Sequence, residues 1–274
     1  MNNILFIIEI IFLNLLHQTT MSSASSMATK QSILQKFGTQ PADGKWAIDF
    51  QMRDENDMTF LMHFIPFISR SEIDKFIGWT SYMCKNVDNF GKTALIYAMD
   101  QGRKDIVKAL LKSGVSNSGH VYNGNNFLTY IMKFDNIDLE IVELAIKDSN
   151  NNLRHVQHET SYTALILACT RRRVDVALLL IPHSDVDHVA RDGATALIMA
   201  CCSHIFDKSM KPAIEKLVEL SHPSTFNHVS QGSSALSFIR GEDPELEEKI
   251  FKKTTSIDIL TRYAHTIGMG GNSL

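Results

Sequence analysis

Two clusters of histidine and aspartate carry side chains that bind transition metals. His155 and His158 lie three residues apart, and a second cluster follows further along the chain. The second cluster consists of His183, Asp185, Asp187 and His188. Zinc sites use imidazole and carboxylate groups, but they bring four ligands together at compact spacing. Neither cluster has that spacing, so the sequence predicts no metal site.

Three consecutive arginines, Arg171, Arg172 and Arg173, have the chemistry to bind an anion. Guanidinium groups form paired hydrogen bonds with carboxylates and phosphates. A short run of like charge is more often a solvated turn, and we favour that interpretation. Contact with an anion or an acidic partner is the alternative.

Motifs of catalysis are missing from the sequence. It contains no nucleophile elbow, phosphate-binding loop, HExxH motif or paired CxxC motif. The glycines of GMGGNS, close to the C-terminus, follow no predicted strand and open no helix, so we expect a flexible tail there and not a dinucleotide-binding loop. We therefore expect a protein that is not an enzyme and that uses neither a cofactor nor a small-molecule substrate.

Composition narrows the classes of partner. The 274 residues include 27 Lys and Arg against 30 Asp and Glu, a net charge of −3. This balance gives no general attraction to nucleic acid or anionic lipid, so we expect no nucleic-acid partner. Cys84, Cys169, Cys201 and Cys202 are too few and too scattered to make a disulfide scaffold. They favour a reducing compartment, and we expect a cytoplasmic protein.

An apolar run from Ile4 to Leu16 conflicts with that location. Its length suits the core of a secretory signal and is short of the roughly 20 residues that span a bilayer. Glu9 and the lack of a preceding Lys or Arg argue against insertion. Three interpretations of residues 1–20 stay open: a signal or anchor that makes the protein secreted or membrane-associated, an interfacial or packed helix, or an artefact before a true start at Met21 or Met27.

The sequence contains internal repeats, and these predict the structural elements that hold the residues described above. The segment FGKTALIYAM at 90–99 recurs in degenerate form at 57–64, 123–132, 161–169, 192–201 and 231–239. A Thr-like residue anchors each copy, and successive anchors lie 32 to 39 residues apart. The six anchors are Thr59, Thr93, Asn126, Thr163, Thr195 and Ser234. Repetition at this period predicts stacked units of supersecondary structure in place of one globule.

Each copy has the pattern of a turn followed by a helix. Two residues after the anchor all six copies have Leu, and five residues after it they have Ala, Ile or Phe. This spacing makes a helical stripe that can be buried. Two residues before the anchor, four copies have Gly, which permits the positive φ of a tight turn, and the anchor side chain can then cap the helix.

A second apolar stripe follows in the clearer copies. It begins 13 residues after the anchor in the best-defined copy, which has Ile106, Val107, Leu110 and Leu111. Spacing of i, i+1, i+4 and i+5 places these side chains on one face of a second helix. Because neither helix can bury its stripe alone, stability must come from neighbouring units.

These repeats resemble the ankyrin repeat, a unit of about 33 residues built from a turn and two helices. The segment DNFGKTALIYAMDQGRKDIVKALLKSGV at 88–115 matches the family pattern DxxGxTPLHxAxxxGxxxIVxxLLxxGA almost position by position. The resemblance covers about six repeats from Arg53 to Lys253. It implies an all-α fold, an ankyrin-type α-solenoid of stacked helix-turn-helix repeats with β-hairpin-like turns. Around it we expect an apolar segment at 1–20, a linker and N-terminal cap at 21–52, and a C-terminal tail at 254–274.

The copies depart from the family pattern in informative ways. The family's Pro is replaced by Ala or Phe and its His by Met, Ile, Thr or Ser, which removes a local polar tie but preserves helix formation. The fifth copy has five extra residues around Ser203–Lys211, either a neutral insertion or a partner-contacting loop. The resemblance also accounts for the acidic residues of 183–188 as hairpin consensus, and it places Cys169 and Cys201 in the core.

The resemblance implies a non-catalytic module that binds another protein through a concave surface of hairpin tips and first helices. In the family, partner-binding residues usually flank the turn glycine and the exposed end of the first helix. Carried over by position, these residues are Asn89, Phe90, Lys92, Asp100, Gln101, Tyr122, Asn123, Asn125, Glu159, Thr160, Tyr162, Arg191 and Asp192. Phe90, Tyr122 and Tyr162 are the strongest predictions, because aromatic residues dominate interface hot spots. For each residue a merely tolerated surface position is the alternative.

We therefore predict a monomeric scaffold or adaptor whose partner is another protein. The alternative function is a regulatory subunit or an inhibitor that docks on an enzyme such as a kinase or protease. Membrane contact is expected only if residues 4–16 act as a signal or anchor.

Overall fold

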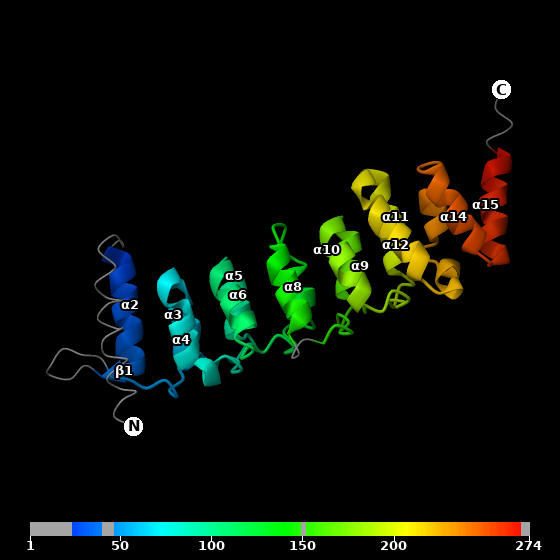
Figure 1. Cartoon of the computed structure of the whole chain (residues 1–274). Coiled ribbons are helices and arrows are strands. Elements are labelled where there is room, and N and C mark those ends of the chain that lie inside the picture. The colour runs from blue at the N-terminus through cyan, green and yellow to red at the C-terminus, as the bar shows by residue number, and fades with distance from the viewer. Residues whose placement is uncertain (1–23, 40–46, 149–151, 270–274) are drawn as a thin grey trace. The chain divides into compact units, whose positions relative to one another are not determined.

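A computed structural model describes residues 24–39, 47–148 and 152–269 (Figure 1). Within these ranges the regular secondary structure is almost all helical. The apolar run at 4–16 lies outside the described residues. Among the helices of the described ranges, none combines the length and hydrophobicity that a membrane crossing requires. The chain divides into two compact units, one of Met1–Asn123 with Lys147–Asn151 and the other of Gly124–Ile146 with Asn152–Leu274.

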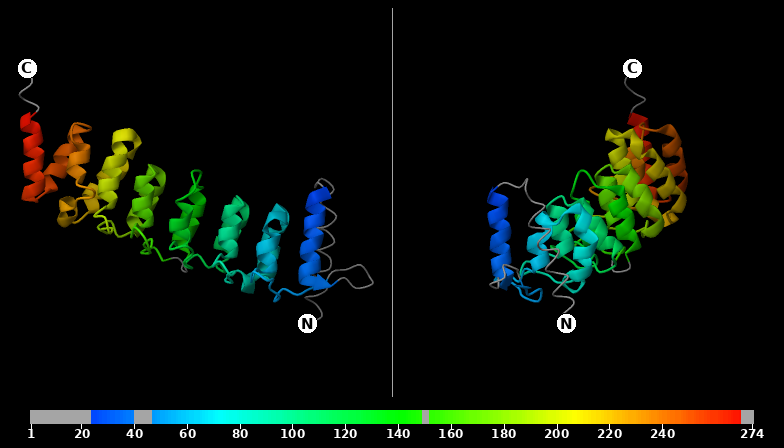
Figure 2. Two further views of the ribbon diagram at one scale, coloured as in Figure 1. Left: turned by 180° about the vertical axis from the view of Figure 1, so that it is seen from behind. Right: turned by 60° about the vertical axis from the view of Figure 1, so that its left-hand side comes forward.

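The first unit contains an N-terminal helix and two repeats. Helix α2 (Ala24–Phe37) leads into strand β1 (Gly38–Thr39), which pairs antiparallel with β2 (Ala47–Ile48). The first repeat has helices α3 (Phe60–Phe64) and α4 (Ile73–Trp79), with 3-10 helices η1 (Ile65–Phe67), η2 (Arg70–Glu72) and η3 (Ser81–Met83). The second repeat has α5 (Ala94–Asp100) and α6 (Lys104–Lys112). Helix α2 lies beside α3 in both figures and buries Leu34 and Phe37 (Figures 1 and 2).

The second unit holds four further helix pairs and a C-terminal helix. The first helices of these pairs are α7 (Phe127–Ile131), α9 (Ala164–Thr170), α11 (Ala196–Phe206) and α13 (Ala235–Ile239). The second helices are α8 (Leu139–Lys147), whose last residue groups with the first unit, α10 (Val174–Leu180), α12 (Lys211–Leu220) and α14 (Pro244–Lys253). The 3-10 helices η4 (Ile181–His183), η5 (Lys208–Met210) and η6 (Pro223–Asn227) lie between them, and α15 (Ile257–Met269) follows.

Each first helix begins at its predicted anchor. The backbone two residues earlier has positive φ in all six repeats, with Gly in four and with Asp57 and Ser161, each at φ 61°, in the other two. The anchor is extended, and its side chain accepts a hydrogen bond from the backbone N–H three residues later. Asn126 does this as well as Thr or Ser, so the third repeat keeps its cap without a hydroxyl.

The predicted Leu column forms the centre of the core. All six Leu side chains are at most 1% exposed, and the residues five positions after the anchors are at most 2% exposed. The second stripe is buried too, as Ile106, Val107 and Leu110 show in α6. Full burial of such a side chain stabilises the fold by roughly 1.5–3 kcal/mol. The predicted all-α, ankyrin-type architecture of stacked helix pairs is therefore confirmed.

Two segments are more ordered than the sequence pattern suggested. The extra residues of the fifth repeat lengthen α11 to 11 residues and add η5. The expected C-terminal tail contains α15, where Ile259 is 6% exposed and the Tyr263 hydroxyl donates a hydrogen bond to Glu247. A helix over 257–269 thus covers the last repeat, and only 270–274 of the expected tail lie outside the described residues.

Candidate interaction surface

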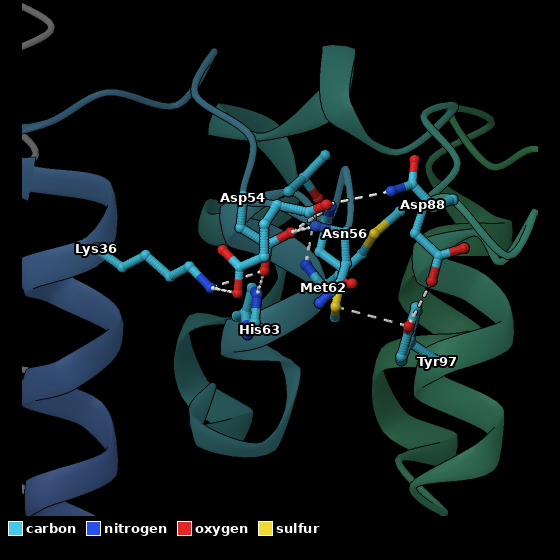
Figure 3. A network of polar contacts seen from close by, with 11 residues as sticks. Lys36, Asp54, Asn56, Met62, His63, Asp88 and Tyr97 are labelled. Atoms are coloured by element: carbon cyan, nitrogen blue, oxygen red, sulfur yellow. Dashed lines mark hydrogen bonds and ion pairs between the residues drawn. The ribbon is translucent and has the colours of Figure 1, made fainter.

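One buried carboxylate holds the tip of the second repeat. Asp88 is 4% exposed, and its Oδ1 accepts hydrogen bonds from the backbone N–H groups of Phe90 (2.9 Å) and Lys92 (2.7 Å). Its Oδ2 accepts a hydrogen bond from the Tyr97 hydroxyl at 2.6 Å (Figure 3). Gly91, between the two donors, has φ 80°. These contacts fix the backbone of the tip before any partner arrives.

Phe90 projects from this fixed turn, and its side chain is 69% exposed. Nearby, the Lys92 ammonium lies 5.2 Å from the Tyr97 ring centroid and 5.6 Å from that of Tyr122, and 2.8 Å from the Asp100 carboxylate. The hydrogen bond to Asp100 is the main reason that the pKa of Lys92 is raised. The tip therefore carries the exposed ring of Phe90, the fixed ammonium group of Lys92 and, beside it, the half-buried ring of Tyr122.

The remaining predicted residues of the first unit occupy the same region. Gln101 caps the C-terminal end of α5 and is exposed, and Asn123 is exposed with φ 48°. All seven predicted contact residues of this unit are thus at least partly accessible. They are Asn89, Phe90, Lys92, Asp100, Gln101, Tyr122 and Asn123.

Hydrogen bonds join successive tips within each unit. In the first unit the Asn89 N–H donates to the Asn56 carbonyl at 2.9 Å, and the Asn89 side chain donates to the carbonyl of the residue before Asn56. In the second unit the Arg191 N–H donates to the Thr160 carbonyl at 3.3 Å, and its guanidinium donates to the Glu159 carbonyl at 3.2 Å. Asn89 and Arg191 both stand four residues before their anchors, so one repeat position supplies the tie in both units.

In the second unit, Tyr162 and Asp192 form a pair on neighbouring tips. The Tyr162 hydroxyl donates to Asp192 at 2.8 Å, and burial together with this hydrogen bond raises the pKa of Tyr162 to about 12. Asn125 differs from the other predicted contact residues, because it is only 4% exposed. Its Oδ1 accepts a hydrogen bond from Gln157 at 2.6 Å, which uses it inside the fold. We therefore leave Asn125 out of the candidate surface.

A column of histidines, which the sequence pattern did not reveal, also connects the repeats. In each case Nε2 lies within hydrogen-bond distance of the carbonyl of the positive-φ residue in the preceding tip. The pairs are His120 with Gly91 at 2.9 Å, His155 with Gly124 at 3.0 Å and His188 with Ser161 at 2.8 Å. The three histidines stand at different distances from their anchors, which hides the column from a search at fixed spacing.

Three residues of the two histidine and aspartate clusters make contacts between repeats. His155 and His188 belong to the histidine column, and Asp187 accepts hydrogen bonds from the Thr225 hydroxyl at 2.5 Å and the His222 N–H at 2.9 Å. Within residues 24–39, 47–148 and 152–269, no three His, Cys, Asp or Glu side chains are placed to hold a metal ion. The arrangement serves packing of the hairpins.

The arginine run divides into two parts. Arg173 donates to the Phe134 carbonyl at 2.6 Å, and Arg103, at the same repeat position, donates to the Ile65 carbonyl at 2.6 Å. A solvated turn is therefore wrong for Arg173, which fastens its repeat to the preceding one. Arg171 and Arg172 are exposed.

A second buried carboxylate joins α2 to the first repeat (Figure 3). The Asp54 side chain is 1% exposed and lies 2.7 Å from Nε2 of His63 and 3.0 Å from Nζ of Lys36. Its Oδ1 accepts hydrogen bonds from the N–H groups of Asn56 and Met58. Burial alone would raise the pKa of Asp54, but these hydrogen bonds outweigh burial and lower it to about 2. The carboxylate is ionised at neutral pH and fastens the helix.

Asp54→Asn is expected to lower the free energy of unfolding at pH 7 by about 2 kcal/mol, because the pKa of Asp54 is about two units lower in the folded than in the unfolded chain. A lowered pKa stabilises the fold above the unfolded value near 4, and that contribution disappears as the pH falls toward 2. Urea unfolding at a series of pH values should show the gap between wild type and variant closing over this range. Glu55→Gln, which alters a carboxylate with 72% exposure, is the control and should have little effect. A gap for Asp54→Asn that is independent of pH would contradict the role of this network.

The structure consists of stacked helix pairs in which each first helix is capped. Hydrogen bonds join the hairpin tips of neighbouring repeats within each unit. These features define a class of repeat protein. A family model of three ankyrin repeat copies matches residues 128–223, and a model of a single ankyrin repeat matches residues 90–120. The chain therefore contains ankyrin repeats. These matches span about four repeats, and the same turn-and-helix geometry at Thr59 and Ser234 extends the pattern on both sides.

Three solved structures have a similar fold. An ankyrin repeat domain from Acinetobacter baumannii AYE aligns with a TM-score of 0.54 at 19% identity, covering 67% of this chain and 96% of that one. The ankyrin repeat protein EF0377 aligns with a TM-score of 0.57 at 21% identity, covering 71% and 97%. The ankyrin repeat domain of Bcl-3, a member of the IkappaB family, aligns with a TM-score of 0.56 at 17% identity, covering 74% and 86%. Similarity at these identities shows the fold alone.

Proposed function

We propose that this chain is a non-catalytic protein-interaction module, a scaffold or adaptor that binds a partner protein through its hairpin tips. The observation that carries the proposal is Phe90, whose ring is 69% exposed on a turn fixed by the buried Asp88. Aromatic residues are enriched among interface hot spots, and a fixed backbone lowers the entropy that binding costs. Ankyrin repeats are generally protein-interaction modules.

The distribution of the other side chains supports this surface. The apolar stripes of the helices are buried between repeats, so they are not available to a partner. The tips present partly accessible polar groups instead, including Lys92, Tyr162, Arg191 and Asp192. Protein interfaces typically have aromatic residues at their centre and polar residues around them.

The three buried cysteines, Cys84, Cys169 and Cys201, are poor candidates for nucleophilic catalysis. Burial raises the pKa of Cys84 to about 12 and that of Cys169 to about 12, and it also raises the pKa of Cys201. Thiols with such pKa values hold almost no reactive thiolate at neutral pH. All four cysteines are free, which favours a reducing compartment.

Phe90→Ala combined with Tyr122→Ala is expected to weaken capture of the native partner at least about tenfold, since each lost hot spot is worth about 1 kcal/mol or more. Helical circular dichroism and melting temperature should change little, because Phe90 is exposed and Tyr122 is only half-buried. The measurement is co-purification of the partner with tagged full-length chain from the native cell. Undiminished capture by a folded variant would show that the tips are not the binding surface.

A further inference from the structure

A strip of basic and aromatic residues lies at the other end of the first helices from the tips. It comprises Lys133, which follows α7, Arg171 and Arg172, which follow α9, and Phe206, the last residue of α11. Helix α9 has 7 residues, which places the strip about 10 Å from the tip at which the helix begins. All four residues belong to the second unit.

The members of the strip contact one another from repeat to repeat. The Arg172 guanidinium carbon lies 4.7 Å from the Phe206 ring centroid. The Arg171 guanidinium donates to the Lys133 carbonyl at 3.5 Å. The Lys133 ammonium lies 5.0 Å from the ring centroid of Tyr130. These contacts connect the ends of α7, α9 and α11 into one continuous surface.

The three cations of the strip form no ion pair with the described residues. Other lysines of this unit do, as Lys208 with Glu242 at 2.6 Å and Lys211 with Asp243 at 2.9 Å show. Asp207, beside Phe206, accepts a hydrogen bond from the N–H of Ser209 at 2.9 Å and forms no ion pair with Arg172. Lys133, Arg171 and Arg172 therefore have no ion-pair partner among the described residues, although the charge of Arg172 adds to the hydrogen bonds of Ser209 in lowering the pKa of Asp207.

Phe206 adds an apolar element to this charge. Its ring is 68% exposed, although it ends the helix that the five extra residues of the fifth repeat have lengthened. Cations at helix C-termini favour the helix dipole, which explains basic residues here but not an exposed ring. The insertion thus places the exposed Phe206 ring against the Arg172 guanidinium. An exposed ring beside a cation is suited to contact with a partner.

We propose that this strip binds an acidic segment of a partner protein that also carries apolar side chains. The proposal rests on the proposed function as a protein-binding module and names the chemistry of a second contact. Carboxylates of the segment pair with Lys133, Arg171 and Arg172, and an apolar side chain packs on Phe206. With a net charge of −3 and only three unpaired cations in the strip, a long nucleic-acid backbone is the poorer match.

The size of the strip sets the length of that segment. Packed helices lie 8–10 Å apart, so the ends of three neighbouring first helices span roughly 16–20 Å. Extended chain rises about 3.3 Å per residue, and about five or six residues cover this distance. A hexapeptide is therefore long enough to reach from Lys133 to Phe206.

The test is titration of the full chain against a fluorescein-labelled acidic hexapeptide, Glu-Asp-Leu-Glu-Asp-Leu, followed by fluorescence anisotropy at an ionic strength of about 0.15 M, where the Debye length is about 8 Å. We expect saturable binding that Arg171→Glu with Arg172→Glu weakens at least about tenfold and Phe206→Ala at least about threefold. The matched control is Lys75→Glu with Lys85→Glu, which makes the same charge change at two exposed lysines of the first unit. This control should stay within about twofold of wild type, because the two lysines are not part of the strip and their substitution alters only the net charge of the chain. Circular dichroism of each variant reports whether the fold is kept.

Several outcomes would overturn the proposal. They are absence of saturable binding, equal loss in the control variant, and equal affinity for the neutral peptide Gln-Asn-Leu-Gln-Asn-Leu. Preference for a single-stranded oligothymidylate or for phosphatidylserine vesicles would replace the acidic segment with a phosphate-bearing ligand. Phe90→Ala with Tyr122→Ala should bind the acidic peptide as wild type does. If the acidic peptide fails to bind while that variant still loses its partner, the strip is wrong and the tip surface stands.

Discussion

Replacing Leu165 with Asp is expected to abolish cooperative folding of the second unit. Leu165 is 0% exposed in the Leu column of α9. Truncating a buried Leu costs about 2–5 kcal/mol, and burying an unpaired carboxylate adds several kcal/mol more. The sum rivals the whole stability of a typical domain, about 5–15 kcal/mol. Because repeats are stabilised by their neighbours, the damage should spread from the fourth repeat to those on either side.

Limited proteolysis with helical circular dichroism measures this effect. New cleavage sites should appear within 127–206, and helical signal should fall. Leu178→Asp is the matched control, since Leu178 is 39% exposed on α10. The control should keep the wild-type cleavage pattern. An unchanged cleavage pattern in Leu165→Asp would mean that the repeat register is wrong.

Gly193→Ala should be far more damaging than the same change at the equivalent glycine of the last repeat. Gly193 has φ +81°, and an added Cβ would lie 2.1 Å from the carbonyl oxygen of Val229. That carbonyl is backbone of the next tip, where the Ser230 N–H is bonded to the Ser233 carbonyl, so it has little freedom to move. Gly232 has φ +82° but no atom within 4 Å of such a Cβ.

Both variants carry the left-handed backbone strain of about 1–2 kcal/mol, and only Gly193→Ala adds a backbone clash. We expect the clash to cost about 1–3 kcal/mol more, measured as a lower midpoint of chemical unfolding. Because both variants carry the same kind of backbone strain, the difference between their midpoints measures the clash between the two tips. Equal midpoints for the two variants would show that the fifth and sixth tips do not pack as described.

The repeat geometry was predictable from sequence because it depends on residues that recur in every copy. The Leu column, the anchor caps and the turn glycines stand at fixed offsets, and the structure confirms them. Asp57 and Ser161 show the limit of this reasoning, because both take positive φ without being glycine. The surrounding hairpin imposes that conformation, and no local pattern marks it.

The candidate surface was predictable only where exposure follows from repeat position. Phe90 is exposed as expected, whereas Asn125 is buried because Gln157, 32 residues later, donates to its side chain. The histidine column and the inward direction of Arg173 likewise depend on contacts between repeats. Such contacts join residues that are distant in sequence, so offsets within one copy cannot reveal them.

The lengthened α11 and helix α15 were underestimated for a related reason. Neither segment repeats, so comparison among copies gave no template for them. Their order comes from packing on the neighbouring helices, as Ile259 of α15 shows by its burial. Phe206 stays exposed at the end of the added turn and gives the strip its apolar member.

The central claim, that the tips bind a partner protein, is tested most directly by capturing partners from the native cell with three full-length chains. These are the wild type, the tip variant Phe90→Ala with Tyr122→Ala, and a control with Tyr82→Ala and Leu178→Ala. Tyr82 of η3 and Leu178 of α10 are 52% and 39% exposed and are not among the predicted contact residues, so the control removes exposed apolar surface elsewhere. We predict that the partner, quantified by mass spectrometry, stays with wild type and control and falls at least about tenfold with the tip variant. Equal recovery with the tip variant, or equal loss with the control, would contradict the account.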